Sequence, residues 1–420
     1  MVSPIKSNKG IAMNDAKRMV SLTAGLIFVA VSVRAPAQDW PQWRGPNRDD
    51  KVSGFTPPKT WPQEFHQKWK VSVGQADATP ALMGDRLFVF ARADDNEVIQ
   101  CLDAATGKVI WSNKYEALAP DGGAAQHPGP RSSPTVAEGK VVTLGVRGTL
   151  SCLDAADGKL VWRKNDIHGY PRFFTASSPL VINGLCVAQL GAATNGVMVA
   201  YDLSTGVEKW KWSGDGTAYA SPVVMAIGDT KLIVMQTDKR IVAVNAADGT
   251  LAWEAPFKPS GMGVNAATPI IEGQTIIYTG LGRGAVAVQL EKQGETFTAK
   301  QLWANPDLSP RFCTPVLKDG LLYGLSDKAG FYCINAKTGQ TAWSEANTER
   351  GGFGSVLDAG SALVALTPKS HLIVFQPSDK AYTEVASIKV ADTATYAQPV
   401  LAGDRVFVED QDSVTLWTVD

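Results

Sequence analysis

Short apolar runs recur along the chain, separated by turns that are rich in Gly, Asp and Lys. Examples are RLFVFA (86–91), KVVTLGV (140–146), TIIYTG (275–280) and LLYGLS (321–326). These runs alternate in polarity and are rich in β-branched residues, which is typical of β-strands. The pattern predicts a protein made of many short strands.

One longer pattern links these strands in pairs. The segment CLDAATGKVIW (101–111) returns as CLDAADGKLVW (152–162), AYDLSTGVEKW (200–210), AVNAADGTLAW (243–253) and CINAKTGQTAW (333–343). The Asp or Asn side chain can bond the backbone two residues on, and the Gly supplies the positive φ of a hairpin turn with a bulge. Each copy is therefore predicted to be a strand, a tight turn and a second strand that carries a Trp.

The repeat tryptophans lie 40 to 51 residues apart. Because a lone hairpin cannot bury so large a ring by itself, we expect each ring to pack against the neighbouring unit. The residues are Trp69, Trp111, Trp162, Trp210, Trp253, Trp303 and Trp343.

A second marker, Ser or Thr followed by Pro, precedes each unit. It occurs as Thr79-Pro80, Ser133-Pro134, Ser178-Pro179, Ser221-Pro222, Thr268-Pro269 and Thr314-Pro315, with degenerate copies at 354–356 and 397–399. A unit of roughly 40 to 50 residues with four short strands matches a propeller blade. The predicted fold is all-β, an eight-bladed β-propeller of four-stranded blades.

The two ends of this propeller, residues 66–420, are predicted to close the ring. The last unit (398–420) has room for three strands, and QKWKVSV (67–73) precedes the first Pro marker. We expect this N-terminal strand to complete the last blade, which removes a free sheet edge.

The N-terminus carries the pattern of a secretory signal peptide, residues 1–37. Lys17 and Arg18 precede the apolar run 19–33, and the small residues Ala35 and Ala37 follow. This pattern predicts export to the periplasm or the extracellular space. A membrane anchor is the alternative, although the run is shorter than the ~20 residues of a span. After removal of the signal no transmembrane segment is expected.

Residues 38–65 form a Pro- and Trp-rich arm without periodicity. Trp40, Trp43 and Trp61 are too apolar for a solvated linker, so we expect the arm to pack on the propeller. A role in binding a partner is the alternative.

Charge, cysteine content and histidine spacing indicate which kinds of binding site are not expected. The net charge is −1, and loss of the basic leader makes the remainder more negative, so a nucleic-acid surface is not indicated. The five cysteines are interpreted as buried apolar residues, with a disulfide framework as the alternative. His127 and His168 could share a metal, but no third ligand stands at zinc-like spacing.

The repeat LDAxTGKxxW resembles the tryptophan-docking motif of the pyrroloquinoline quinone (PQQ) repeat propellers. The arm DWPQWRGPNRD resembles the N-terminal segment of exported PQQ-like repeat proteins. This superfamily includes quinoprotein dehydrogenases and non-enzymatic BamB-like members. The dehydrogenases imply an adjacent Cys-Cys pair, a Glu, Asn and Asp set on calcium and an Asp base, whereas no two cysteines here are adjacent. The resemblance therefore favours the BamB-like members, without catalytic residues or cofactor.

Loops that enter the innermost strands converge on one end of a propeller channel. Large and charged side chains at this position favour a rim that binds a ligand or peptide, while plugging of the channel is the alternative. The candidate rim residues are Asp77, Arg131, Tyr219, Asn265, Arg311, Phe312, Phe353 and Tyr396.

The sequence thus predicts an exported, monomeric, non-catalytic propeller. Its partner would be a protein or saccharide of the cell envelope, bound through the rim loops or the blade edges. A PQQ- or metal-dependent oxidoreductase, with PQQ and calcium as cofactors, is the alternative function, because fold alone does not decide chemistry.

Overall fold

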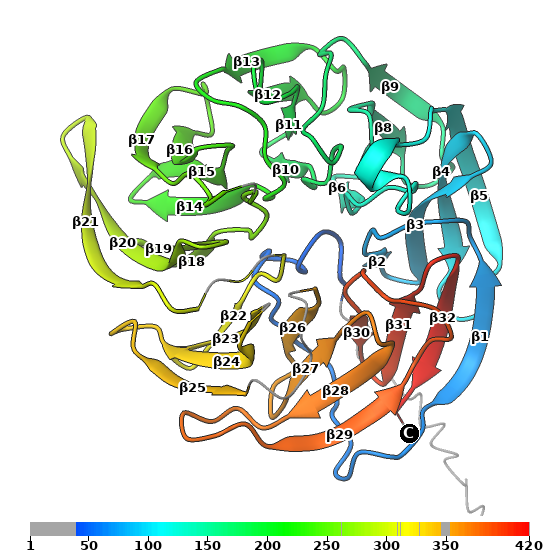
Figure 1. Ribbon diagram of the computed structural model, residues 1–420. Coiled ribbons are helices and arrows are strands. Elements are labelled where there is room, and N and C mark those ends of the chain that lie inside the picture. The colour runs from blue at the N-terminus through cyan, green and yellow to red at the C-terminus, as the bar shows by residue number, and fades with distance from the viewer. Residues whose placement is uncertain are drawn as a thin grey trace, which may run out of the picture. The chain divides into compact units, whose positions relative to one another are not determined.

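The chain folds into a ring of eight antiparallel sheets with four strands each (Figure 1). The computed structural model describes residues 39–261, 263–308, 310, 312–326, 328–345 and 353–419, so the predicted signal peptide lies outside the described residues. Within these ranges the only helix is the short 3-10 turn η1 (Gly122–Ala124). The prediction of an eight-bladed β-propeller is confirmed.

Each blade begins with its innermost strand, which borders the central channel, and the chain then runs outward. Blades 1 to 4 comprise β2 (Ala81–Met83), β3 (Arg86–Ala93), β4 (Asn96–Asp103) and β5 (Val109–Glu116); β6 (Thr135–Ala137), β7 (Lys140–Leu144), β8 (Leu150–Asp154) and β9 (Leu160–Lys164); β10 (Leu180–Ile182), β11 (Leu185–Leu190), β12 (Val197–Asp202) and β13 (Glu208–Trp212); and β14 (Val223–Ile227), β15 (Thr230–Gln236), β16 (Arg240–Asn245) and β17 (Leu251–Pro256).

Blades 5 to 8 repeat this order, except that blade 8 takes its fourth strand from the N-terminus. They comprise β18 (Ile270–Glu272), β19 (Thr275–Gly280), β20 (Gly284–Gln293) and β21 (Thr296–Asn305); β22 (Val316–Lys318), β23 (Leu321–Ser326), β24 (Gly330–Asn335) and β25 (Thr341–Glu345); β26 (Ser355–Asp358), β27 (Leu363–Leu366), β28 (His371–Phe375) and β29 (Glu384–Lys389); and β30 (Val400–Ala402), β31 (Arg405–Glu409), β32 (Ser413–Thr418) and β1 (His66–Ser72).

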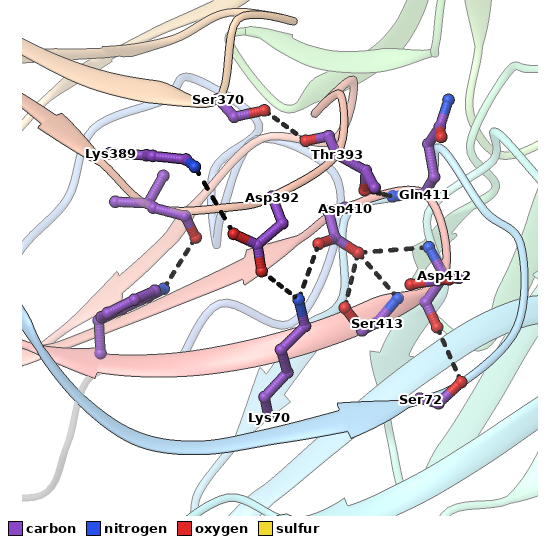
Figure 2. Close-up of polar contacts among 12 residues, drawn as sticks. Lys70, Ser72, Ser370, Lys389, Asp392, Thr393, Asp410, Gln411, Asp412 and Ser413 are labelled. Atoms are coloured by element: carbon purple, nitrogen blue, oxygen red, sulfur yellow. Dashed lines mark hydrogen bonds and ion pairs between the residues drawn. The ribbon is translucent and has the colours of Figure 1, made fainter.

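The N-terminal strand closes the ring, as predicted. Strand β1 pairs antiparallel with β32, the last strand of the chain. Lys70 of β1 forms ion pairs with Asp410, 3.4 Å away at the end of β31, and with Asp392, 3.2 Å away in the connection from blade 7 (Figure 2). The Asp410 carboxylate also accepts hydrogen bonds from the backbone and hydroxyl of Ser413. These contacts fasten the closing strand to the rest of blade 8 and to the connection from blade 7.

The repeat tryptophans lie in the seams between blades. The buried ring of Trp162 on β9 packs on Gly206 in blade 3, and its Nε1 donates to the carbonyl of Leu203 at 2.8 Å. A Cβ on Gly206 would stand 2.7 Å from Cγ of this ring, and the turn itself needs φ +69°. Glycine is therefore required there for two reasons. The same indole-to-carbonyl bond joins Trp69 to Ala104, Trp111 to Ala155, Trp210 to Ala246, Trp303 to Ala336 and Trp343 to Ser378.

A belt of hydroxyl groups explains the Ser/Thr-Pro marker. In one blade after another, the backbone N–H at the marker donates to the marker hydroxyl of the next blade, as from Ser133 to Ser178 at 2.9 Å. The described links are Gln398 to Thr79, Thr79 to Ser133, Ser133 to Ser178, Ser178 to Ser221, Ser221 to Thr268 and Thr268 to Thr314. The belt satisfies backbone donors that would otherwise be unpaired in the channel wall.

Candidate functional site

Six of the candidate rim residues line one pocket at the end of the channel where the innermost strands begin. The pocket encloses about 440 Å³. Each residue precedes the Pro marker of its blade, so the ring symmetry places them at a similar height around the axis. They are Asp77, Arg131, Tyr219, Phe312, Phe353 and Tyr396. This pocket is called the channel mouth below.

Two candidates do not belong to the described mouth. Asn265 is buried, and its Nδ2 donates to the carbonyls of Thr237 and Phe257 at 2.8 and 2.9 Å. Its neighbours Val264 and Ala266 face the mouth instead. Placing Asn265 on the rim was wrong, because its amide is used to hold two loops of the same blade together. Arg311 lies outside the described residues.

The N-terminal arm crosses the middle of the ring (Figure 1, dark blue), and its hydrogen bonds reach every blade. Its backbone pairs with Leu82 of blade 1, Val136 of blade 2, Asp358 of blade 7 and Gly403 of blade 8. Its side chains reach the other four blades. Trp40 at its start is fully buried against Gly45, where a Cβ would stand 2.9 Å from the ring. The arm therefore fills the channel below the mouth.

Two buried arginines of the arm bind carbonyl groups of the channel wall. The Arg48 guanidinium donates to the carbonyls of Ser178, Pro179 and Pro222, which belong to blades 3 and 4. Arg44 donates to the carbonyl of Pro315 in blade 6 at 2.9 Å. Burial and the nearby Arg44 charge lower the pKa of Arg48 to about 9. The marker thus also supplies Pro carbonyls that accept hydrogen bonds from the arm.

Asp50 balances one of these charges. Its carboxylate forms an ion pair with Arg44 and accepts a hydrogen bond from Gln398 at 3.0 Å. Burial raises the pKa of Asp50 to about 6, and the contacts with Arg44 and Gln398 act in the opposite direction. Gln398 of blade 8 also lines the mouth, so this side chain connects Asp50 of the arm to the mouth.

Trp43 of the arm also lines the channel mouth. Its Nε1 donates to the marker hydroxyl of Thr268 at 3.2 Å, which joins the ring to the belt. Because the arm fills the channel on the side away from the rim loops, this indole forms part of the floor of the mouth.

A polar pair stands on one side of the mouth. His127 Nδ1 lies 2.8 Å from Asp77 Oδ2. Arg131 donates to the carbonyls of His127 and Phe173, at 2.7 and 2.6 Å, and thereby braces two loops. Burial lowers the pKa of Arg131, while the Asp77 charge acts in the opposite direction.

The other sides are aromatic. The rings of Phe312 and Phe353 stack with centroids 4.4 Å apart, and Tyr396 meets Phe353 edge to face at 5.7 Å. Phe173 and Tyr219 form a second group, with centroids 6.3 Å apart and the Tyr219 hydroxyl accepting from the Phe173 N–H. Phe173 and Phe353 remain 36% and 39% exposed. The mouth thus presents flat apolar surfaces to a ligand.

Two buried polar atoms in the mouth lack a hydrogen-bond partner among the described residues. They are the amide oxygen of Gln398 and the hydroxyl of Ser355. Both side chains stand where the belt departs from its pattern, since Gln398 replaces the Ser or Thr of blade 8 and no described link reaches Ser355. A buried polar group without a partner is costly unless water or a ligand satisfies it.

The described mouth does not supply the donors that the alternative cofactors need. Asp77 is its only carboxylate, and it is paired with His127. No group of three His, Cys, Asp or Glu side chains in the described ranges could hold a metal ion. The five cysteines are free and buried, and none lines the mouth. The described mouth therefore differs from the Cys-Cys pair and the calcium ligands that the dehydrogenase resemblance implies.

Sequence reasoning missed several residues of the mouth. The sequence pattern assigns Trp43 to the arm and Gln398 to a degenerate marker, and it does not single out Phe173. His127 was considered only as a metal ligand with His168. His168 does not line the mouth, and its carbonyl accepts from Asn195. The length of the loops 112–132 and 163–177 was the available signal, since long loops at one propeller face often carry function.

The repeat sequence matches the profile of a known family across residues 59–166 and 95–345, described as outer membrane protein assembly factor BamB. The chain belongs to this family. A BamB of Burkholderia pseudomallei (strain K96243) is 25% identical over 360 residues, which cover 83% of this chain and 86% of that protein. This similarity extends over most of both proteins.

Solved structures share the fold of this BamB-family chain. The crystal structure of BamB from Moraxella catarrhalis superimposes with a TM-score of 0.63 at 15% identity, covering 84% of this chain and 97% of that one. The quinohemoprotein alcohol dehydrogenase from Comamonas testosteroni gives 0.66 at 16% identity, covering 92% and 81%. An assembly factor and an enzyme thus have the same architecture, so the activity has to be argued from the site.

Proposed function

We propose that this BamB-family chain is an exported, non-catalytic propeller that binds a protein or saccharide partner of the cell envelope at its channel mouth. The observation that carries the proposal is the mouth itself. Residues from all eight blades converge there on a partly open pocket with aromatic walls. Such pockets, with a few polar groups among apolar walls, are typical of binding sites.

The assembly role of the named BamB relatives supports a partner in the envelope. Export rests on the leader pattern of residues 1–37 and is part of the proposal, as is the monomeric state. Among the described residues no helix is long and apolar enough to cross a membrane.

The proposal is tested by comparing what the wild-type protein and a Phe353→Ala variant retain from a solubilised envelope fraction. We expect the wild type to enrich a defined partner, and Phe353→Ala to lose it while keeping the wild-type melting temperature. The matched control is Val385→Ala, because Val385 is equally exposed in the same blade but lies on the outermost strand β29. Equal retention by Phe353→Ala and the wild type would place binding elsewhere.

The alternative oxidoreductase function has its own test. Titration with PQQ and calcium, followed by thermal melting and an absorbance scan, should leave the melting temperature unchanged. A saturable shift with a bound chromophore would support the dehydrogenase alternative instead.

A further inference from the structure

The polar groups of the channel mouth are suited to hydroxyl groups. His127 Nδ1 is held by Asp77 at 2.8 Å, which leaves the other ring nitrogen for a ligand. The Gln398 amide oxygen and the Ser355 hydroxyl are buried in the same pocket without described partners. An amide oxygen accepts from a hydroxyl, and a serine hydroxyl either donates or accepts. These groups therefore match a ligand with several hydroxyls.

The charge of the mouth does not favour an ionic ligand. Among its described lining residues there is one carboxylate, Asp77, and one guanidinium, Arg131. Asp77 is engaged by His127, and two nitrogens of Arg131 donate to backbone carbonyls. Because these two opposite charges offset each other, the described lining offers an anion or a cation no net opposite charge to replace its hydration.

The apolar part of the mouth is suited to a ring. Phe353 stacks on Phe312 and is still 39% exposed, and Tyr396 meets it edge to face. The face of an aromatic ring carries partial negative charge, so it attracts the weakly positive C–H groups on the flat side of a sugar ring. A volume of about 440 Å³ lies in the range of pockets for small ligands.

The backbone of the channel wall offers little to an extended peptide. Strand addition needs a row of free N–H and C=O groups. At the start of the innermost strands the belt hydroxyls accept from six backbone N–H groups. The carbonyls of Pro179, Pro222 and Pro315 accept from the arm.

From these contacts we propose that the channel mouth binds a neutral saccharide, with one sugar ring on Phe353 and its hydroxyls bonded to His127, Gln398 and Ser355. This inference rests on the proposed function and names the class of its partner. It assigns the aromatic pair to stacking and the buried polar atoms to hydroxyl recognition.

The test uses the full-length protein on an array of neutral cello-, malto-, xylo- and chito-oligosaccharides, with acidic oligosaccharides and a peptide array beside it. The best neutral disaccharide is then titrated calorimetrically. We expect binding to at least one neutral series, about tenfold weaker in both Phe353→Ala and His127→Ala and unchanged in Val385→Ala. Melting curves of each variant separate a loss of binding from a loss of folding, and Phe353→Ala remains informative if His127→Ala does not fold.

The other outcomes separate this inference from the proposed function. Binding to peptides alone, lost in Phe353→Ala, would overturn the saccharide and keep the mouth as a partner site. Binding to acidic oligosaccharides alone would overturn the neutral ligand. If no array member binds in a manner that depends on Phe353, the saccharide is wrong, and the retention of envelope partners by Phe353→Ala then decides the proposed site separately.

Discussion

Trp162 shows how one residue joins two blades. Its ring is buried against Gly206, and its indole N–H is bonded to Leu203 in the next blade. Replacing Trp162 with Ala should lower the free energy of unfolding by ~3–5 kcal/mol, because it leaves a cavity in the seam and removes the indole hydrogen bond to Leu203. Urea denaturation measures this. The control is Leu160→Ala on the same strand, an exposed position where the change should stay within about 0.5 kcal/mol. Equal stability of Trp162→Ala and the wild type would contradict this role.

Glu409 is a buried acid whose ionisation opposes folding. Both of its carboxylate oxygens lack a partner among the described residues. Burial, with the charges of Asp77 and Asp410, raises its pKa well above the usual value. In the unfolded chain the pKa is about 4.3, so the folded state holds a proton that the unfolded state has released. The contribution of Glu409 is therefore greatest below pH ~4 and declines as the pH rises through the folded pKa.

A Glu409→Gln variant should keep the shape of the side chain and remove this decline. We expect its stability to exceed that of the wild type by an amount that grows from about pH 4 towards neutral pH. Denaturation at several pH values measures the difference. Glu291→Gln, on an exposed part of β20, should follow the wild type throughout. A constant difference between Glu409→Gln and the wild type would show that the pKa of Glu409 is the same in the folded and unfolded states.

At the scale of elements, the arm behaves as a central tie because its contacts reach all eight blades. Arg48→Met would leave the carbonyls of Ser178 and Pro222 without a donor, while the Pro179 carbonyl would keep only the hydroxyl of Thr135. We expect a loss of about 3 kcal/mol or more, since each unpaired buried carbonyl carries its own desolvation penalty. Guanidinium denaturation measures it. Arg240→Met is the control, because the Arg240–Glu254 pair is exposed and should contribute under about 1 kcal/mol. Similar losses in both variants would contradict a central role for the arm.

At the scale of the whole molecule, two features favour unfolding as one unit. Strand β1 joins the two ends of the ring, and the arm joins the blades across its middle. We therefore expect urea unfolding followed by far-UV circular dichroism and by tryptophan fluorescence to give coincident curves. Tryptophans lie in most blade seams, so fluorescence reports on the whole ring. Separate transitions would show that part of the ring opens independently.

The candidate site was only partly accessible from the sequence. The marker or a degenerate copy of it repeats once per blade, and counting back from it located Asp77, Phe353 and Tyr396 at one end of the channel. The same counting misplaced Asn265, whose amide turns towards carbonyls of the preceding blade, blade 4. His127 and Phe173 lie in long loops with no repeat, so no periodicity indicates where their side chains go. That the mouth binds a partner stays a prediction.

The sequence by itself determined the number of blades, their four strands and the closing of the ring by the N-terminal strand. Strand alternation, turn chemistry and the repeat period are local properties that recur in every unit. Only the tertiary structure decided what fills the channel and what the mouth contains. Arg44 and Arg48 of the arm donate to carbonyls that follow them by more than a hundred residues, and the mouth is lined by residues of all eight blades. Such contacts follow from closure of the ring, because only then do distant loops and the arm share one axis.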